Sequence, residues 1–270
     1  MKKLILAVLS MLLTAGVAMA DTNIRVDGST TVLPAMQKMV EAYMKANPGV
    51  NITVSGGGSG NGIKALIDGT TDICMSSREI QPKEIDASKE KGREAKPMAI
   101  AMDAICPIVN PANPVSNLTA EQLQGIYAGK IKNWKDVGGD DKEIVVISRD
   151  TSSGTYEAWN ELIMKGEKVT PAALLQASSG AVMEVVSKNK FAIAYDGIAY
   201  VNNKVKPLKV NGVAGGAESV ANKTYPVSRP LFIILPGSPN PDVQKFVDFI
   251  MSPTGGQKII GEVGYFPVKK

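Results

Sequence analysis

The chain has 270 residues, of which 44% are apolar and 21% charged, a composition that is ordinary for a soluble globular protein and excludes extensive disorder. Its 30 basic and 26 acidic residues give a formal charge of +4, too small an excess for a typical nucleic-acid binder. The absence of histidine excludes a Ser-His-Asp triad, histidine metal ligands and the usual general base of neutral pH.

The start of the chain has the pattern of a secretory signal peptide. A basic beginning (MKK) precedes an apolar stretch at residues 4–19, too short to span a membrane comfortably, and AMA at residues 18–20 matches a cleavage site. We therefore expect cleavage after Ala20, a soluble mature protein that begins at Asp21, and a periplasmic location. No cysteine lies at the cleavage point, so no N-terminal lipid anchor is expected.

The two cysteines, Cys74 and Cys106, each lie in an apolar strand-like segment. In an exported protein they could form one disulfide, and the alternative is a pair of buried free thiols. Their spacing does not decide between these alternatives. Two thiolates are too few ligands for a zinc site, and the sequence predicts neither a metal site nor a cofactor.

After the signal, three strands each end in a turn of small polar residues, and the first two turns lead into helices. The first helix carries an apolar stripe and stops at Asn47, and the second ends at Gly69. A polar helix at residues 82–91 and a strand at residues 97–109 complete this half. The three strands with their turns are residues 23–26 with 27–31 (DGSTT), 50–54 with 55–62 (SGGGSGNG), and 71–75 with 76–79 (SSRE).

The glycine-rich turn at residues 55–62 lacks the Lys-Ser or Lys-Thr pair of a Walker A loop and contains no G-x-G-x-x-G, so nucleotide binding is disfavoured. Its composition alone would fit a flexible linker. Its position between a strand and a helix instead favours a close approach of the backbone to a small ligand, with Ser59 as a hydroxyl donor.

An interruption rich in proline and asparagine at residues 110–115 is the best candidate for a crossing into a second domain, and residues 224–230 form the expected return. We therefore expect a first lobe of residues 21–109 and 227–270 and a second lobe of residues 110–226. Beyond the first crossing the expected elements are helices at 120–127, near 171–176 and at 243–250, and strands at 143–147, 191–195 and 231–235.

Strands that alternate with helices throughout the chain predict the α/β class with mainly parallel sheets, in which ligands bind beyond the carboxyl ends of the strands. One polar turn at such a position is residues 149–155 (RDTSSGT), before a helix at residues 156–163. The first N–H groups of this helix lack internal partners and can bind an anion. Arg149 adds a guanidinium that can hold an oxyanion through two parallel hydrogen bonds. Ordinary helix capping is the alternative interpretation.

Four of these segments, in this order, resemble the periplasmic phosphate-binding protein of the phosphate ABC transporter. The resemblance extends over essentially the whole chain after the signal and implies a two-lobe, type II periplasmic binding protein fold. In that fold two mainly parallel sheets, flanked by helices, are joined by a two-strand hinge, and the cleft closes on one ligand. The segments are GSTT at residues 28–31, GSGNG at 58–62, DICMSSR at 72–78 and RDTSSGT at 149–155.

The resemblance also implies the site and its partners. The ligand is inorganic phosphate, which the protein delivers to the membrane permease subunits of an ABC importer. The protein is expected to be a monomer that binds no nucleic acid and catalyses no reaction. The ligand-binding residues that match the family are Ser29, Thr30, Thr31, Ser59, Ser77, Arg149, Ser153, Gly154 and Thr155.

One position departs from the family pattern. Some members carry an aspartate where this chain has Ser77, and that aspartate accepts the proton of phosphate and so disfavours sulfate. A serine hydroxyl can donate as well as accept, so we expect weaker rejection of sulfate unless Asp103 or Asp150 reaches the ligand. We expect Arg78 to form an ion pair with Asp103 rather than to bind the ligand.

Two alternative functions remain open at this point. One is a binding protein for another tetrahedral oxyanion, namely sulfate, molybdate or tungstate, since such anions need no acceptor; Arg149 favours phosphate without excluding them. The other is a phosphatase-like enzyme in which Ser153 is the nucleophile and Arg149 the electrophile. That enzyme would lack any base within the motif except Asp150.

Overall fold

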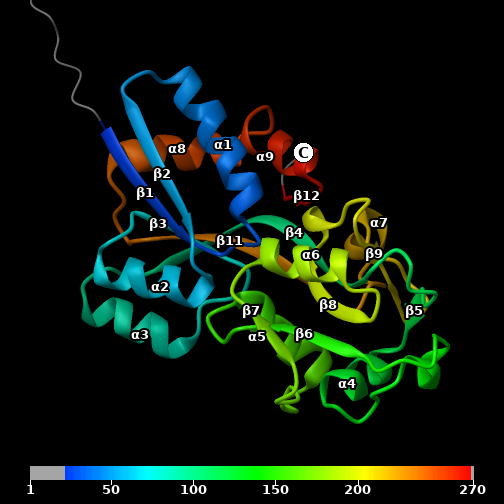
Figure 1. Cartoon of the computed structure of the whole chain (residues 1–270). Helices are drawn as coiled ribbons and strands as arrows, with labels where there is room; N and C mark the ends of the chain where they lie inside the picture. The colour runs from blue at the N-terminus through cyan, green and yellow to red at the C-terminus, as the bar shows by residue number, and fades with distance from the viewer. Residues whose placement is uncertain (1–21, 269–270) are drawn as a thin grey trace, which may run out of the picture.

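The computed structural model describes residues 22–268 (Figure 1). The expected signal peptide, residues 1–20, and the expected mature start at Asp21 lie outside the described residues. Within the described range no helix is both long enough and apolar enough to cross a membrane.

Strands and helices alternate along most of the chain. The strands are β1 Thr22–Gly28, β2 Val50–Gly56, β3 Ile73–Ser76, β4 Lys96–Val109, β5 Asn117–Leu118, β6 Val145–Arg149, β7 Leu174–Gln176, β8 Ala192–Gly197, β9 Lys206–Pro207, β10 Lys209–Val210, β11 Ser228–Leu235 and β12 Phe266–Pro267. The α-helices are α1 Leu33–Ala46, α2 Ser59–Asp68, α3 Pro82–Glu90, α4 Ala120–Tyr127, α5 Gly154–Trp159, α6 Ser179–Lys188, α7 Ala217–Ala221, α8 Pro241–Met251 and α9 Gly256–Val263. Shorter turns of helix are the 3₁₀-helices η1 Trp134–Val137 and η3 Ile198–Tyr200 and the π-helix η2 Asn160–Met164.

The strands form one hydrogen-bonded path in the order β2-β1-β3-β11-β4-β8-β6-β7. Strand β1 is parallel to β2 and β3, and β6 is parallel to β7 and β8. The antiparallel strands β4 and β11 connect these two parallel groups, because residues 96–104 of β4 pair with β11 and residues 105–109 pair with β8. The fold is therefore the expected α/β class, with helices on both faces of the sheet (Figure 1).

The chain passes between the two parallel groups of strands in β4 and again just before β11, and these two segments lie side by side, while the predicted crossing at residues 110–115 and the predicted lobe bounds stay predictions. The Ile105 N–H donates to the Val227 carbonyl over 2.8 Å, and the Tyr225 hydroxyl donates to the Ile105 carbonyl over 2.9 Å. Two large apolar cores lie on either side of these crossings. One contains the apolar stripe of α1, and the other is centred on Trp159 and Tyr195, whose stacked rings have centroids 4.4 Å apart.

The predicted helix near residues 171–176 is wrong. The structure has strand β7 at Leu174–Gln176, and the helix begins only at Ser179, after the Ser178 hydroxyl accepts from the Ala181 N–H. The Ala and Leu residues of this stretch favour helix, but pairing with β6 overrides that local preference. The predicted helix at residues 156–163 begins two residues earlier, at Gly154, and ends as a π-helix.

Both cysteines are free and buried, so the disulfide alternative is not present in the structure. Cys74 lies on β3 and Cys106 on β4, in the middle of the sheet. Burial raises the pKa of the Cys106 thiol to about 12, and it also raises the pKa of Cys74. Both groups therefore behave as small apolar side chains.

Candidate functional site

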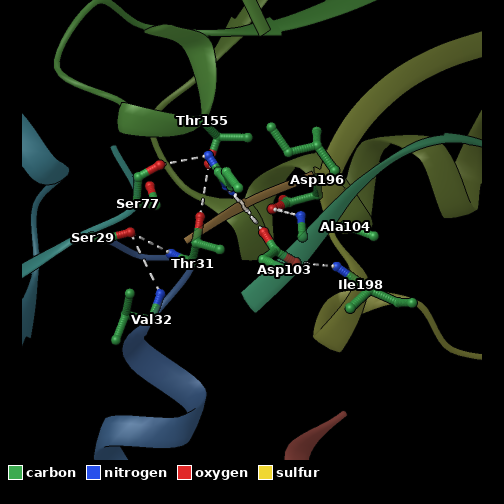
Figure 2. A network of polar contacts seen from close by, with 12 residues as sticks. Ser29, Thr31, Val32, Ser77, Asp103, Ala104, Thr155, Asp196 and Ile198 are labelled. Atoms are coloured by element: carbon green, nitrogen blue, oxygen red, sulfur yellow. Dashed lines mark hydrogen bonds and ion pairs between the residues drawn. The ribbon is translucent and has the colours of Figure 1, made fainter. Parts of the chain in front are cut away.

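The first residues of helices α1, α2 and α5 meet between the two cores. The Thr31 Oγ1 atom, just before α1, lies 2.8 Å from the Thr155 Oγ1 atom on α5 (Figure 2). A Cβ atom added to Gly154 would lie 2.4 Å from the Ser59 Oγ atom of α2, so only glycine fits there. Three helix N-termini from segments far apart in the sequence therefore point at one region, where N–H groups without helical partners favour an anion.

All nine predicted ligand residues lie in this region, and each is buried. Their eight polar side chains are at most 3% exposed. Ser153 also has the capping role that was the alternative interpretation of its motif, and Ser29 accepts N–H groups within its own turn. The Ser29 hydroxyl accepts from the N–H groups of Thr31 and Val32, and the Ser153 hydroxyl accepts from the Tyr156 N–H. In both serines the hydroxyl hydrogen remains available to donate to another acceptor.

Arg149 lies at the end of β6, is only 1% exposed and contacts neutral acceptors. Its guanidinium donates to the carbonyls of Gln176 and Ala177 and to the hydroxyls of Thr30 and Ser179, over 3.0 to 3.3 Å. Among residues 22–268, no carboxylate forms an ion pair with it. We call Thr30, Arg149 and Ser179 the Arg149 cluster. It contains a buried positive charge without a direct ion-pair partner, an arrangement that is costly unless an anion binds.

The glycine-rich turn allows the two halves of the site to approach closely. Gly58 has φ +98°, and a Cβ atom there would lie 2.6 Å from the Ser152 Oγ atom. The Gly60 N–H donates to the Ser152 carbonyl over 2.9 Å. Ser59, between them, accepts from the Ser77 N–H over 3.1 Å. The turn therefore approaches the backbone of the RDTSSGT motif closely, and its predicted approach to a small ligand stays a prediction.

The predicted ion pair between Arg78 and Asp103 is wrong. The Asp103 carboxylate is held by Arg229, whose Nε and NH2 atoms lie 3.1 and 3.0 Å from its Oδ2 atom. Arg229 on β11 stands directly opposite Asp103 on β4 in the antiparallel register, which explains this choice of partner. Arg229 also donates to the Ser77 carbonyl and to the Thr155 hydroxyl, so it holds two of the predicted ligand residues in place.

Arg78 contacts two other carboxylates. Its NH1 and NH2 atoms each lie 2.8 Å from an oxygen of Glu84 on α3, and its Nε atom lies 2.9 Å from Glu157 on α5. Gln81 also donates to Glu157. We call Arg78, Gln81, Glu84 and Glu157 the Arg78 cluster. It is a second contact between the two halves, and in it the charge of Arg78 is compensated by two carboxylates.

Sequence reasoning missed Ser179 and Asp196. The Ser179 hydroxyl donates to the Asp196 Oδ1 atom over 2.9 Å and lies 3.3 Å from the Arg149 NH1 atom. Burial raises the pKa of Asp196 to about 6, against the opposing effect of Arg149. The turn before α6 has the same hydroxyl and glycine residues as the other helix starts, at Ser178, Ser179 and Gly180, but the wrongly predicted helix near 171–176 obscured that signal.

Asp150, the other acidic residue considered for the site, accepts hydrogen bonds from the N–H and hydroxyl of Ser152 within its own turn.

Within the described range no group of three or more acidic or cysteine side chains could hold a metal ion.

Comparisons with protein families and with known proteins agree with one another. A model of the PBP superfamily domain matches residues 13–254. The phosphate-binding protein PstS of Borreliella burgdorferi is 33% identical over 258 residues, which cover 91% of this chain and 90% of that protein. PstS of Staphylococcus aureus is 34% identical over 253 residues, which cover 88% of this chain and 76% of that protein.

Solved structures agree with these matches. A Clostridium perfringens protein described as a phosphate ABC transporter substrate-binding protein, with bound phosphate, is 37% identical with a TM-score of 0.86, covering 92% of this chain and all of that one (100%). An ABC-type phosphate transport receptor of Vibrio cholerae is 34% identical with a TM-score of 0.73, covering 90% of this chain and 99% of that one.

Proposed function

Because this chain belongs to the PBP superfamily, and within it to the phosphate-binding PstS family, we propose that it captures inorganic phosphate and delivers it to an ABC importer. The observation that carries this proposal is Arg149, a buried guanidinium that contacts hydroxyls and carbonyls but no carboxylate. Hydrogen bonds to a charged group inside such a site are the strong ones. An oxyanion would supply the missing counter-charge.

We propose that the nine residues predicted from the family pattern are the ligand residues. Thr31 and Thr155 lie too close to each other for an anion to sit between them, at 2.8 Å, so the two halves move apart slightly when the anion enters. The two separate apolar cores, between which the chain passes in β4 and on its return into β11, support a division into two lobes that can move in this way.

The geometry favours binding over catalysis. Ser153, the nucleophile of the alternative enzyme, accepts the Tyr156 N–H and has no carboxylate among its hydrogen-bond partners in the described residues. Asp150 is occupied by Ser152. A serine without a neighbouring base is a weak nucleophile. A sensitive phosphatase assay on the purified protein should give no activity above that of Ser153→Ala.

We further propose that the protein works as a monomer in the periplasm, after cleavage behind Ala20, and that its partners are the permease subunits of the importer. N-terminal sequencing of the exported protein checks the cleavage site. Uptake of labelled phosphate in cells that lack the gene, with and without a plasmid that restores it, checks the transport role. Equal uptake in both strains would contradict that role.

The identity of the anion is tested by native mass spectrometry of gently purified protein, followed by titration with phosphate, sulfate, molybdate and tungstate. We expect one phosphate per chain and the tightest binding for phosphate. A preference for any of the other three anions would replace phosphate in this proposal while leaving the binding function in place.

A further inference from the structure

The proposed ligand differs from sulfate because it carries a proton that can donate a hydrogen bond. Near neutral pH inorganic phosphate carries at least one P–OH group, whereas sulfate is fully ionised. The helix N–H groups, the guanidinium of Arg149 and the hydroxyls of the site can all donate to an anion. Ser77 stands where some relatives have an aspartate. The P–OH group therefore needs an acceptor that the family pattern does not supply in this chain.

Two buried carboxylates lie near the donors (Figure 2). They differ in whether an oxygen atom remains available to accept a hydrogen bond. Asp103 is occupied at both oxygens, since Oδ2 accepts two bonds from Arg229 and Oδ1 accepts the Ile198 N–H. In Asp196, Oδ1 accepts from Ser179 and from the Gly197 N–H, while Oδ2 is a buried atom without a hydrogen-bond partner in the described residues. Asp196 therefore retains accepting capacity that Asp103 lacks.

Ser179 is also an acceptor, because its hydroxyl hydrogen is already donated. Its single hydroxyl hydrogen goes to the ionised Asp196, so the Ser179 Oγ atom presents lone pairs to Arg149 and toward Thr30, whose Oγ1 atom is 3.4 Å away. Thr30 has the opposite role. Its Oγ1 atom accepts from the Arg149 NH2 group and from the Ser179 N–H, which leaves its own hydrogen to donate.

We propose that Ser179 and Asp196 form the acceptor side of the anion site: they take the hydrogen bond from the P–OH group of phosphate and so discriminate against fully ionised oxyanions. This inference rests on the proposed phosphate-binding function and assigns its selectivity to two residues outside the family pattern. Sulfate brings no proton, so it faces the Asp196 carboxylate without a hydrogen bond between them. Ser179 can donate to sulfate only if it turns away from Asp196, which leaves a second carboxylate oxygen unpaired.

Several charged and titratable groups lie around Asp196. Arg149 of β6 and Arg229 of β11 face it as cations. Tyr200 and Tyr265 act on it electrostatically, and the pKa of each is raised by burial; Cys106 has a pKa of about 12. The chain contains no histidine. Burial raises the pKa of Asp196 to about 6 and also raises the pKa of Asp103, which Arg229 holds; of these two carboxylates, Asp196 is the one that contacts Ser179.

The first test is calorimetric titration of wild type and Asp196→Asn with phosphate and with sulfate at pH 8. The amide is close in size to the carboxylate but can donate to sulfate. We expect the ratio of phosphate affinity to sulfate affinity to fall about 10-fold or more in Asp196→Asn. Asp136→Asn, an equal charge change on an exposed residue of η1, is the matched control and should keep the wild-type ratio.

The second test needs only the wild-type protein. Sulfate stays fully ionised between pH 5 and pH 8, so any rise in its affinity reports on the protein. Protonation of Asp196 frees Ser179 to donate, and we expect sulfate affinity to rise about 10-fold from pH 8 to pH 5. A sulfate affinity that does not change with pH, or an unchanged anion ratio in Asp196→Asn, would overturn the proposal. In that case tight phosphate binding by wild type would still uphold the proposed function, whereas its absence would contradict both.

Discussion

Two of the contacts between the halves of the molecule each bury an arginine, and the two arginines have different partners. Arg78 is 8% exposed and contacts two carboxylates, Glu84 and Glu157. Arg149 is 1% exposed and contacts none in the described residues. In the sequence both follow an apolar strand and both have hydroxyl residues beside them. The surroundings in space, and not the local sequence, therefore distinguish an arginine that stabilises the fold from one that is free to bind an anion.

This difference follows from the cost of burying charge. A buried cation is tolerated when partners replace the water it has lost, and removal of one partner of a buried pair is strongly destabilising. The Arg78 cluster is complete without a ligand. The Arg149 cluster is complete in hydrogen bonds, but its guanidinium has no direct ion-pair partner in the described residues, so we expect an anion to bind there. Each prediction below tests this distinction.

The largest expected effect is that of Arg149→Met on anion binding. Loss of the guanidinium removes a charged, buried partner of the anion, and we expect phosphate affinity to fall about 100- to 1,000-fold, or about 3 to 4 kcal/mol. Titration calorimetry measures this effect. Arg25→Met, at a half-exposed arginine of β1, is the control and should bind as wild type. An Arg149→Met protein that binds phosphate normally would show that the charge is not used.

Arg78→Met should show the opposite pattern. It leaves Glu84 and Glu157 without their cation, and we expect the free energy of unfolding to fall by about 3 kcal/mol. Denaturant titration of the ligand-free protein measures this change, and Arg149→Met provides the comparison because it removes no ion pair. If Arg78→Met unfolds like wild type but loses phosphate binding, the assignment of the two arginines is reversed.

The pH dependence of stability sharpens the account of Asp196. Its pKa of about 6 in the folded protein lies above the value near 3.9 of an unfolded chain. The folded state therefore binds more protons between these values, and its stability contribution is present below about pH 4 and lost as pH rises through 6. The lost contribution is about 2 to 3 kcal/mol. Asp196→Asn lacks this loss. Denaturant titration at pH 4 and pH 8 should therefore show that the free energy of unfolding of the variant, relative to that of wild type, rises with pH. Parallel pH profiles would contradict the buried, ionisable state of Asp196.

The smallest effect is expected at Glu157, the member of the Arg78 cluster on α5. Glu157→Gln removes one partly exposed ion pair between the halves, and we expect phosphate affinity to fall about 5-fold, or about 1 kcal/mol. Glu161→Gln, on an exposed neighbour, is the control. A 100-fold loss in Glu157→Gln would mean that this cluster, too, belongs to the site.

Local patterns in the sequence are sufficient to predict much of the site. The apolar stripe of α1, the helix at residues 120–127 and the polar turns after β1, β2 and β6 are visible within short windows. Because β1 and β2 are parallel, their carboxyl ends share an edge of the sheet, but β6 belongs to the other parallel group and runs the opposite way. The resemblance to the family, and not these local patterns alone, is what brings the nine residues of the four turns together.

The errors concern contacts that depend on register between distant strands. Arg229 takes Asp103 because β11 lies antiparallel to β4 with these two residues opposite each other, and no local pattern reveals that pairing. Strand β7 forms because β6 lies next to it, in a stretch whose composition favours helix. Asp196 is the next-to-last residue of β8, and only its position beside Ser179 distinguishes it from other acidic residues.

The most direct test of the central claim is calorimetric titration of the ligand-free wild-type protein with phosphate near neutral pH, in the presence of a large excess of sulfate. A site with an uncompensated guanidinium and an acceptor pair should bind one phosphate per chain, with an affinity that sulfate barely changes. Absence of binding, or competition by sulfate on equal terms with phosphate, would contradict the account.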